Sequence, residues 1–280
     1  MSKLAGLSKG FLKWAVMAYI SAFAALFIAQ RPLVFGHYAF LQPAKPAWDA
    51  KLPGEKVALK TADGETLDAW YIPPAHSGRA TIVYFHGKSA NIAHKQQRMA
   101  ELTRDGLGLF AVDYRGFGAS TGSPSQEGLS ADADAAYKWM TKRTGAEKLV
   151  VFGESLGSGV AVDLAARVPV GALVLEAPYT ATVDVAVERY PLFPVRFVMW
   201  DTFPSVEKIA RVKAPILIQH GKLDITIPVK FGEQLFAAAP EPKKLVLYDN
   251  AGHKDMPTHG SFRDLKEFVT ANVEHAFAAR

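Results

Sequence analysis

The stretch KLVVFGESLGSGVAVDLAAR (residues 148–167) passes directly from an apolar run to a run rich in small residues. The apolar run, residues 148–152, predicts a buried strand, and residues 157–167 predict a helix. Between them lies Gly153-Glu154-Ser155-Leu156-Gly157, a G-x-S-x-G pentapeptide. In a strand–turn–helix setting the serine sits in strained backbone at the tip of the turn, and flanking glycines let strand and helix approach closely. Ser155 is therefore the candidate nucleophile of this chain.

Length and composition restrict the class of protein. The chain has 280 residues, of which 49% are apolar, and this suits one large α/β domain with a substantial core. The net charge of +5 is spread thinly, without a dense basic block, which argues against nucleic-acid binding. There is no cysteine, so disulfides, thiolate metal sites and a cysteine nucleophile are excluded.

From residue 57 onward, apolar runs alternate with helical patterns. Asp63-Gly64 marks a hairpin turn between the first two runs, so we expect antiparallel strands at one edge. The alternation that follows predicts a mostly parallel central sheet with helices on both faces. The other predicted strands are residues 57–61, 66–72, 81–85, 107–112, 172–175, 216–218 and 245–248, and the other long helices are residues 94–105, 125–144, 229–239 and 262–276.

The N-terminal segment is long and apolar. Residues 11–29 carry one charge, Lys13, and about 18 residues at a rise of about 1.5 Å nearly cross a hydrocarbon core of about 30 Å. Lys3, Lys9 and Lys13 precede the apolar part, which favours an N-in orientation with the rest of the chain on the outer, periplasmic or extracytoplasmic, side. We expect residues 1–30 to be a single-pass membrane anchor. A cleaved signal peptide and a buried or interfacial amphipathic helix are the alternatives.

Two further segments interrupt the alternating pattern. Residues 31–56 are rich in proline and predict a linker on or near the membrane, with Tyr38 and Trp48 as candidate interfacial residues. Residues 57–280 form the predicted catalytic domain. Within it, residues 179–212 include a bulky apolar run, which is either a core-facing crossover or a short lid over a substrate pocket. We expect the lid, because this segment follows a strand and lies over the carboxyl ends of the sheet.

A serine hydroxyl needs a base, an acid that orients the base, and donors for an oxyanion. His253 follows the last predicted strand, and Asp224 follows the strand that ends at Gln219. Both loops leave the same edge of the sheet as Ser155, and the chain order Ser–Asp–His is the one found with this motif. We therefore expect a triad of Ser155, Asp224 and His253.

Other residues compete for these roles. The alternatives to the base are His259 and His275, and the alternative acid is Asp249. His220 sits in a turn and is expected to be structural. A metal site from His253, Asp255 and His259 fits no standard spacing, so we expect neither a metal nor a cofactor.

Two backbone N–H groups are candidates for the oxyanion hole. The first belongs to Leu156, at the start of the helix after the serine. The second belongs to Lys88, in the loop His86-Gly87-Lys88 that follows the strand 81–85. Losing one such donor typically costs about 3–4 kcal/mol of transition-state stabilisation. We expect Asn91 to tie this loop together through its side chain.

Four motifs occur in order along the chain: Phe85-His-Gly-Lys-Ser-Ala-Asn91, Asp113-Tyr-Arg-Gly-Phe-Gly-Ala-Ser-Thr-Gly122, Gly153-Glu-Ser-Leu-Gly157 and His220-Gly-Lys-Leu-Asp-Ile-Thr-Ile-Pro228. Together they make the chain resemble the α/β-hydrolase superfamily, over about four-fifths of its length. More narrowly, it resembles a small membrane-anchored, bud-emergence-type branch whose domains are often labelled serine-aminopeptidase-like. The resemblance implies a Ser–His–Asp hydrolase, with the triad on Ser155, His253 and Asp224 and the oxyanion donors on Lys88 and Leu156.

Two of these motifs raise separate hypotheses. Relatives commonly carry a small or amide residue where this chain has Lys88, so the lysine side chain is a candidate for recognising acidic groups. The glycine-rich loop from Asp113 lacks the spacing of a nucleotide site, and we expect Asp113 and Arg115 to brace it beneath the active site.

Three functions remain open from the sequence. The first is hydrolysis of carboxylic esters or thioesters through an acyl-enzyme on Ser155, with a lipophilic acyl or lipid substrate favoured by the anchor and the bulky lid. The second is a serine peptidase, for which Glu188 is the one candidate to bind a substrate amine. The third is a membrane-tethered binding protein that keeps the fold without catalysis.

Overall fold

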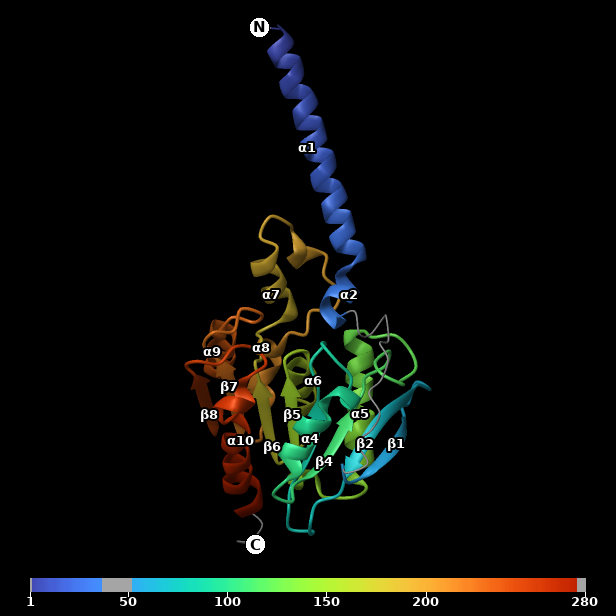
Figure 1. The fold of residues 1–280 in the computed structure, drawn as a ribbon, viewed down its shortest axis with the longest axis vertical. Coiled ribbons are helices and arrows are strands. Elements are labelled where there is room, and N and C mark those ends of the chain that lie inside the picture. Colours follow the sequence, from blue (N-terminus) through green and yellow to red (C-terminus); the bar gives the residue numbers. More distant parts are fainter. Residues whose placement is uncertain (1, 37–51, 276–280) are drawn as a thin grey trace.

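The computed structural model describes residues 2–36 and 52–275 and shows one eight-stranded sheet between layers of helices (Figure 1). The strand order is β1-β2-β4-β3-β5-β6-β7-β8. The strands are β1 (Glu55–Lys60), β2 (Thr66–Ile72), β3 (Thr81–Phe85), β4 (Gly108–Val112), β5 (Leu149–Glu154), β6 (Ala172–Glu176), β7 (Ile216–Gly221) and β8 (Lys243–Tyr248).

The direction of the strands agrees with the sequence prediction. The opening hairpin is antiparallel, with Lys60 opposite Thr66, and β2 pairs antiparallel with β4. All other pairs, from β4–β3 to β7–β8, are parallel. The carboxyl ends of the parallel strands therefore meet at one edge, where Ser155 follows β5 and Asp224 follows β7.

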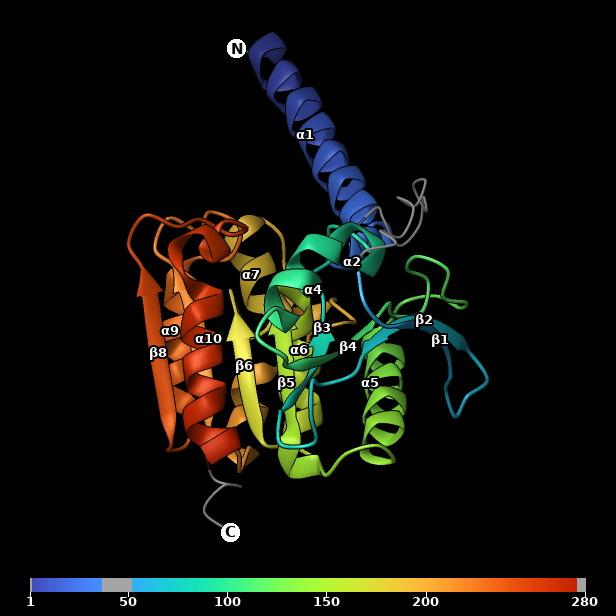
Figure 2. The ribbon, with the colours of Figure 1, turned by 60° about the horizontal axis from the view of Figure 1, so that its bottom comes forward.

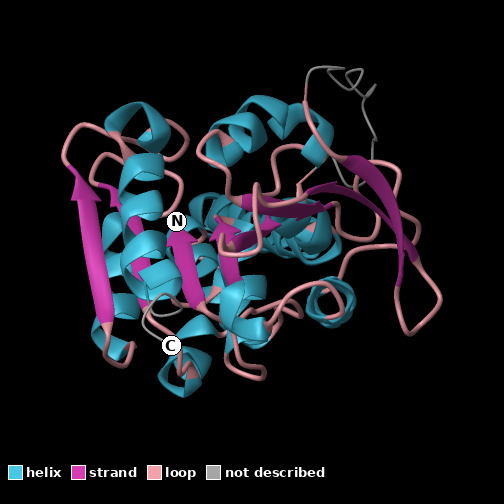
Figure 3. Cartoon of the chain, turned by 90° about the horizontal axis from the view of Figure 1, so that it is seen from below, coloured by secondary structure: helices cyan, strands magenta, loops and turns pink. Residues whose placement is uncertain are grey.

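Helices cover both faces of this sheet (Figures 2 and 3). One face packs against α4 and α10, and the other packs against α5, α6, α8 and α9. The prediction of an α/β fold with two helical layers is confirmed. The helices are α1 (Ser2–Ile28), α2 (Gln30–Phe35), α4 (Gln96–Thr103), α5 (Gln126–Thr141), α6 (Leu156–Ala165), α7 (Thr182–Arg189), α8 (Ser205–Lys208), α9 (Val229–Ala238) and α10 (Ser261–Val269), with a π-helical turn at Thr270–Glu274.

The central strands are buried on both faces because helices cover both of them. In β3, Val83 and Phe85 point into the core beneath α5 and α6, whereas Ile82 and Tyr84 point into the core beneath α4 and α10. Successive side chains of a strand face opposite ways, so a strand between two layers reads as a continuous apolar run. This is why the sequence pattern located β3 and β5 closely.

Some element boundaries differ from the sequence prediction. The helix predicted from residue 94 begins as a 3-10 turn at Ile92–Lys95, where Asn91 accepts a hydrogen bond from the His94 N–H. The helix predicted from residue 125 begins one residue later, because Ser125 is its N-cap and accepts from the Gly128 N–H. The prediction placed the cap Ser125 inside the second helix, and in the first it began three residues after the cap Asn91.

The N-terminal helix α1 extends away from the sheet, and its lower end lies beside the predicted lid (Figure 1). Within α1, Gly10–Ile28 is long and apolar enough to cross a membrane, although an N-terminal signal sequence has the same character. Whether the segment anchors the protein stays a prediction, as do the boundaries at residues 30 and 56.

The region after α1 differs from the predicted linker. Residues 30–35 form the helix α2, and Phe35 is completely buried in the main core, edge-on to Phe203 with ring centroids 6.2 Å apart. Phe35 therefore belongs to the domain core, although it lies near the start of the predicted linker at residues 31–56. Residues 37–51, including Tyr38 and Trp48, lie outside the described residues.

The burial of Phe35 yields a stability prediction. Phe35→Ala should lower the free energy of unfolding of the full chain in detergent by about 3–5 kcal/mol, because it removes a buried aromatic ring and leaves a cavity. Phe197→Ala is the matched control, since Phe197 is 87% exposed, and it should cost less than about 0.5 kcal/mol. Equal losses in urea titrations of the two variants would show that α2 is not part of the folded core.

Candidate active site

Ser155 lies at the sharp turn between β5 and α6 in a backbone conformation that few non-glycine residues adopt, with φ of 51° and ψ of −116°. Its N–H donates to the carbonyl of Glu176 at 2.8 Å, so the last residue of the neighbouring strand holds the turn. A Cβ on Gly157 would lie 2.0 Å from the carbonyl oxygen of Phe85, which excludes any other residue there. The predicted strained turn with close strand–helix contact is present.

The structure brings Ser155, His253 and Asp224 together. Ser155 Oγ lies 3.0 Å from His253 Nε2, and His253 Nδ1 lies 2.7 Å from Asp224 Oδ2. With the proton on Nδ1 donated to the carboxylate, Nε2 is left as an acceptor for the serine hydroxyl. The three residues come from loops after β5, β7 and β8, as the chain order predicted.

Asp224 is held in place by several donors. Its Oδ1 accepts from the N–H groups of Thr226 at 2.8 Å and Ile227 at 2.9 Å. Burial acts to raise the pKa of Asp224, but hydrogen bonds from His220 and His253 outweigh burial and lower the pKa overall. The carboxylate therefore stays ionised around neutral pH and presents a fixed charge to the imidazole.

His220 contacts the catalytic candidate Asp224, which the sequence analysis did not predict. It is fully buried, its Nε2 lies 2.8 Å from the carbonyl of Ile227, and the same nitrogen lies 3.3 Å from Asp224 Oδ2. His220 is structural, as expected, and it also faces the acid. The four-residue spacing between His220 and Asp224, across the turn after β7, is the sequence signal that could have indicated this contact.

The rivals for these roles lie elsewhere. Asp249 is largely exposed and pairs with Lys222 at 2.6 Å, and His259 is half-buried near Asp255 at 3.9 Å. His275, at the end of the described chain, is exposed. Within residues 2–36 and 52–275, no group of three or more histidine and acidic side chains is arranged to hold a metal ion.

The loop after β3 carries Lys88, one of the two predicted oxyanion donors. Gly87 lies so close to Ser155 that a Cβ on it would come within 3.3 Å of the serine Cβ, and the N–H of Lys88 follows it in the chain. Tyr114 donates its hydroxyl to the His86 carbonyl at 2.9 Å, and His86 Nε2 lies 3.2 Å from Asp113. The loop is thus fixed beside the nucleophile.

The other predicted donor is at the start of α6. Leu156 is the first residue of that helix, so its N–H is one of those that have no partner inside the helix. The N-terminus of α6 also favours a negative charge. Leu156 and the pocket-lining Lys88 therefore flank Ser155 from two different elements.

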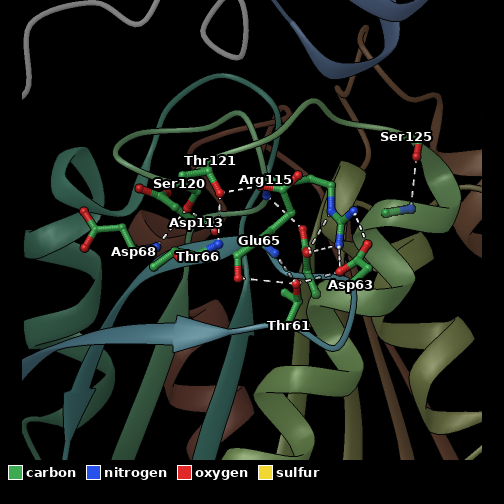
Figure 4. Close-up of polar contacts among 12 residues, drawn as sticks. Thr61, Asp63, Glu65, Thr66, Asp68, Asp113, Arg115, Ser120, Thr121 and Ser125 are labelled. Carbon is green, nitrogen blue, oxygen red and sulfur yellow. Dashed lines mark hydrogen bonds and ion pairs between the residues drawn. The ribbon is translucent and has the colours of Figure 1, made fainter.

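The glycine-rich loop 113–122 is braced by polar contacts, as predicted (Figure 4). Arg115 joins the hairpin turn to α5, because its guanidinium contacts Asp63 at 2.7 Å and Asp132 at 2.8 Å. Asp113 accepts from the Ile92 N–H at 2.7 Å, and its carbonyl accepts from Ser120 at 2.8 Å. These bonds connect the first hairpin to the loop that carries Lys88.

The side chain of Lys88 has a partner that the sequence did not suggest. Its ammonium donates to the carbonyl of Leu33 at 2.6 Å, in the last turn of α2. The surrounding protein and the nearby charge of Arg189 lower the pKa of Lys88. Lys88 thus ties the loop beside the nucleophile to the segment that leads from α1.

A network of charged side chains is buried beneath the nucleophile, and sequence reasoning missed it. Arg98 lies between the carboxylates of Glu154 and Glu176, with an ion pair to each. Lys95 also contacts Glu154 at 2.8 Å, and Ser261 donates to Glu176 at 3.2 Å. Glu154 occupies the variable position before Ser155 and Glu176 ends β6, so both glutamates come from strand ends at the site.

The two glutamates respond differently to this environment. Burial acts to raise the pKa of Glu154, but Arg98 and Lys95 outweigh it and lower the pKa. Burial dominates at Glu176 and raises its pKa. Arg98 therefore pairs with both carboxylates, and Lys95 supplies the second positive charge at the strand ends beside the nucleophile.

A pocket of about 410 Å³ opens at Ser155. Its walls are mostly apolar and come from α7, the lid segment around Met199, the loop after β7 and α2. Residues of the segment predicted as a lid therefore line the pocket at Ser155, and its role as a lid stays a prediction. The described lining includes Leu33, Val34, Val185, Ala186, Tyr190 and Ile227.

Comparison with known proteins shows the family of this chain. The family described as "Serine aminopeptidase, S33" matches residues 76–207. An uncharacterized protein of Mycobacterium tuberculosis is 35% identical over 86% of this chain and 87% of its own length. The alpha/beta hydrolase domain-containing protein 17B of Xenopus tropicalis is 31% identical, covering 76% of this chain and 74% of that protein.

Solved structures share the fold. An acetyl xylan esterase from Paenibacillus sp. R4 has a TM-score of 0.68 at 20% identity, covering 89% of this chain and 94% of that chain. An esterase of Pyrococcus furiosus has a TM-score of 0.68 at 18% identity, covering 82% of this chain and 98% of that chain. The chain belongs to the α/β-hydrolase superfamily.

The buried network yields a prediction that depends on pH. Arg98→Met should lower the free energy of unfolding at pH 7.5 by about 3–5 kcal/mol, because it leaves two buried carboxylates without their shared partner. In the variant the pKa of Glu154 rises in the folded state, so the folded protein takes up a proton first as pH falls. Urea titrations should therefore show a smaller deficit at pH 5.

Arg104→Met is the control for this measurement. Arg104 lies just after α4, is 70% exposed and pairs only locally with Glu101, so its loss should cost less than about 1 kcal/mol at either pH. A deficit for Arg98→Met that equals that of the control, or that widens on acidification, would contradict the proposed role of the network.

Proposed function

We propose that this protein is a serine hydrolase that cleaves carboxylic ester or thioester bonds through an acyl-enzyme on Ser155. One observation carries the proposal: an unbroken chain of hydrogen-bond contacts runs from Ser155 Oγ to His253 Nε2 at 3.0 Å and from His253 Nδ1 to Asp224 at 2.7 Å. Membership of the α/β-hydrolase superfamily supports a hydrolase in general terms.

The first half-reaction transfers the acyl group to the enzyme. Ser155 Oγ attacks the carbonyl carbon while His253 Nε2 takes the hydroxyl proton. The carbonyl oxygen becomes an oxyanion between the N–H groups of Lys88 and Leu156. The tetrahedral intermediate then expels the alcohol or thiol, which receives the proton from His253, and the acyl group remains on Ser155.

The second half-reaction releases the acid. Water attacks the acyl-enzyme, His253 accepts a proton from it, and collapse of the intermediate returns the serine hydroxyl and a carboxylic acid. Asp224 stays ionised throughout, orients the imidazole and stabilises its positive charge. The two half-reactions use the triad, the N–H groups of Lys88 and Leu156, and one water molecule.

The pocket favours a lipophilic acyl substrate. The lining at Ser155 is dominated by aliphatic and aromatic side chains from α2 and the lid. Burial of apolar surface is worth about 25 cal/mol per Å², so such walls favour a hydrocarbon chain over a polar one. Two similar folds are described as esterases, which is consistent with ester chemistry.

An aminopeptidase is the second candidate, because the matched family carries that name. Recognition of a free amine needs an acidic group near the nucleophile. Glu188, the one candidate, pairs with Lys230 at 2.7 Å, and among the described residues that line the pocket none is acidic. The charged lining residues are Lys88 and Arg189, which disfavour an amine and suit an anionic group beside the ester.

We also propose that the protein is held in a membrane by one N-terminal helix, N-in, with the catalytic domain on the outer side. The apolar stretch Gly10–Ile28 supports the span, and Lys3, Lys9 and Lys13 support the orientation. A non-catalytic tethered protein is disfavoured, because nothing in such a protein would maintain the strained turn and the aligned histidine.

Labelling and kinetics test the proposal together. A fluorophosphonate should label the wild type and leave Ser155→Ala unlabelled. Asp224→Asn should lower kcat on p-nitrophenyl esters by roughly 10³–10⁴, because the imidazole loses the acceptor that fixes its tautomer. Aminoacyl amides should be poor substrates of the wild type beside the esters and acyl thioesters.

Asp249→Asn is the matched control for the acid, since Asp249 is 74% exposed and is the rival carboxylate. Its rate should stay within about twofold of the wild type. Equal labelling of wild type and Ser155→Ala, or equal losses in the two aspartate variants, would refute the triad.

A further inference from the structure

The end of the N-terminal helix packs against the lid along one face. Three side chains at the end of α1 have the spacing of a single helix face, namely Phe23, Leu26 and Phe27. Together with Gln30, at the start of α2, they line a hollow beside the lid. Ala22, Ala24 and Ala25, on the other faces of the same turns, are exposed. At this end of α1, one face of the helix therefore packs against the domain.

Specific contacts hold this face to the lid. Tyr19 stacks on Phe193 with centroids 5.1 Å apart, and Phe27 meets Trp200 edge-on at 5.2 Å. Tyr19 also donates its hydroxyl to the Leu192 carbonyl at 2.9 Å. An anchor that only tethers the protein needs none of these contacts.

Polar bonds fix the transition from α1 to α2. The Trp200 N–H donates to the Gln30 side chain at 2.9 Å, and Arg31 contacts Asp201 at 3.2 Å. Asp201 is buried and also accepts from the Gln126 N–H at 2.7 Å. The junction is thereby joined to the lid and to the first turn of α5.

Helix α2 then forms a wall of the active-site pocket. Leu33 and Val34 line the pocket that contains Ser155, and Lys88 donates to the Leu33 carbonyl. Gly36, with φ of 79°, passes so close to the Lys88 carbonyl that a Cβ there would lie 2.7 Å from its oxygen. The segment from the membrane helix is thus built into the site.

The hollow between α1 and the lid adjoins this pocket. Both are bordered by Leu33, Val34, Ala186, Tyr190 and Met199. The hollow is narrow, at about 60 Å³, which is about the room of two water molecules. Its one amide, Gln30, is already bonded to Trp200, so the lining suits a slender apolar chain and no polar headgroup.

The lid segment lies beside the lower end of α1 (Figure 1), and it carries large apolar side chains that are exposed. Leu192 is 80% exposed, Phe197 is 87% exposed and Trp200 is 56% exposed. Surface apolar groups gathered next to a helix of membrane-spanning length mark a surface that contacts lipid. The hollow lies between α1 and the lid segment that carries this surface.

We propose that the junction of α1 and α2 is part of the substrate-binding site, and that the acyl chain of a membrane lipid reaches Ser155 through the hollow between this junction and the lid. The inference rests on the proposed function and names its substrate class: an ester or thioester whose acyl chain resides in the bilayer. The helix is then retained in the working protein, since its removal would open one wall of the pocket.

Chain-length dependence tests the passage. The full-length protein in phosphatidylcholine nanodiscs is assayed with 4-methylumbelliferyl palmitate and acetate. Leu26→Trp fills the hollow and should lower the palmitate-to-acetate ratio of kcat/KM by at least about tenfold. Ala24→Trp, two residues away on the exposed side of the helix, should change the ratio by less than about twofold.

A second measurement does not depend on turnover. Palmitic acid with a terminal diazirine is photo-crosslinked to Ser155→Ala in the same nanodiscs, and the adducts are mapped by mass spectrometry. We expect adducts at the residues that line the hollow, such as Phe27 and Met199, and their loss in the double variant with Leu26→Trp.

The outcomes separate this inference from the proposed function. An unchanged ratio in Leu26→Trp, or adducts only outside the hollow, overturns the passage while ester hydrolysis by the wild type still stands. If the wild type hydrolyses no ester, the proposed function fails, and adducts in the hollow still decide for or against the passage. Equal effects of Leu26→Trp and Ala24→Trp also overturn it.

Discussion

The close approach of α6 to β3 at Gly157 is the constraint on which the site depends. With no side chain at Gly157, the helix start lies against the Phe85 carbonyl, and the turn before it is forced to place Ser155 at φ of 51°. Such a conformation costs of order 1–3 kcal/mol and persists only when the surroundings over-determine it. Here the Glu176 carbonyl and the two flanking glycines supply that determination.

Charged side chains are buried below the nucleophile at the same edge of the sheet. Arg98 pairs with two buried glutamates, and its guanidinium also lies over the ring of Phe262 at 4.9 Å. Buried ion pairs add little net stability, because desolvation offsets their attraction. Their value here lies in positioning. Glu154 directly precedes Ser155, and the carbonyl of Glu176 accepts from the Ser155 N–H, so a satisfied network keeps both strand ends in register.

Much of this site could be predicted from the sequence, because its signals are local. Apolar runs located the strands, the glycines marked the turn, and the parallel sheet placed Ser155, Asp224 and His253 at one edge. Contacts between distant segments had no local signal. Nothing near Lys88 indicates that its ammonium reaches Leu33, and nothing near Phe35 indicates that the start of the predicted linker lies in the core.

Helix α2, which follows α1, connects the proposed membrane anchor to the active site. Lys88 belongs to the loop proposed to bind the oxyanion, and the same residue holds the helix that leads from α1. In this account the apolar helix, the lid and the catalytic loop are one structural unit around the acyl pocket. A change at the junction would therefore reach the loop beside the nucleophile without touching the triad.

The central claim is that Ser155 is a nucleophile that carries the acyl group. The most direct measurement is intact-protein and peptide mass spectrometry of the full-length protein, acid-quenched within milliseconds of mixing with a p-nitrophenyl ester. The account predicts a mass increase equal to the acyl group, on the peptide that contains Ser155. Turnover with no covalent adduct at Ser155, or with the adduct on another residue, would contradict it.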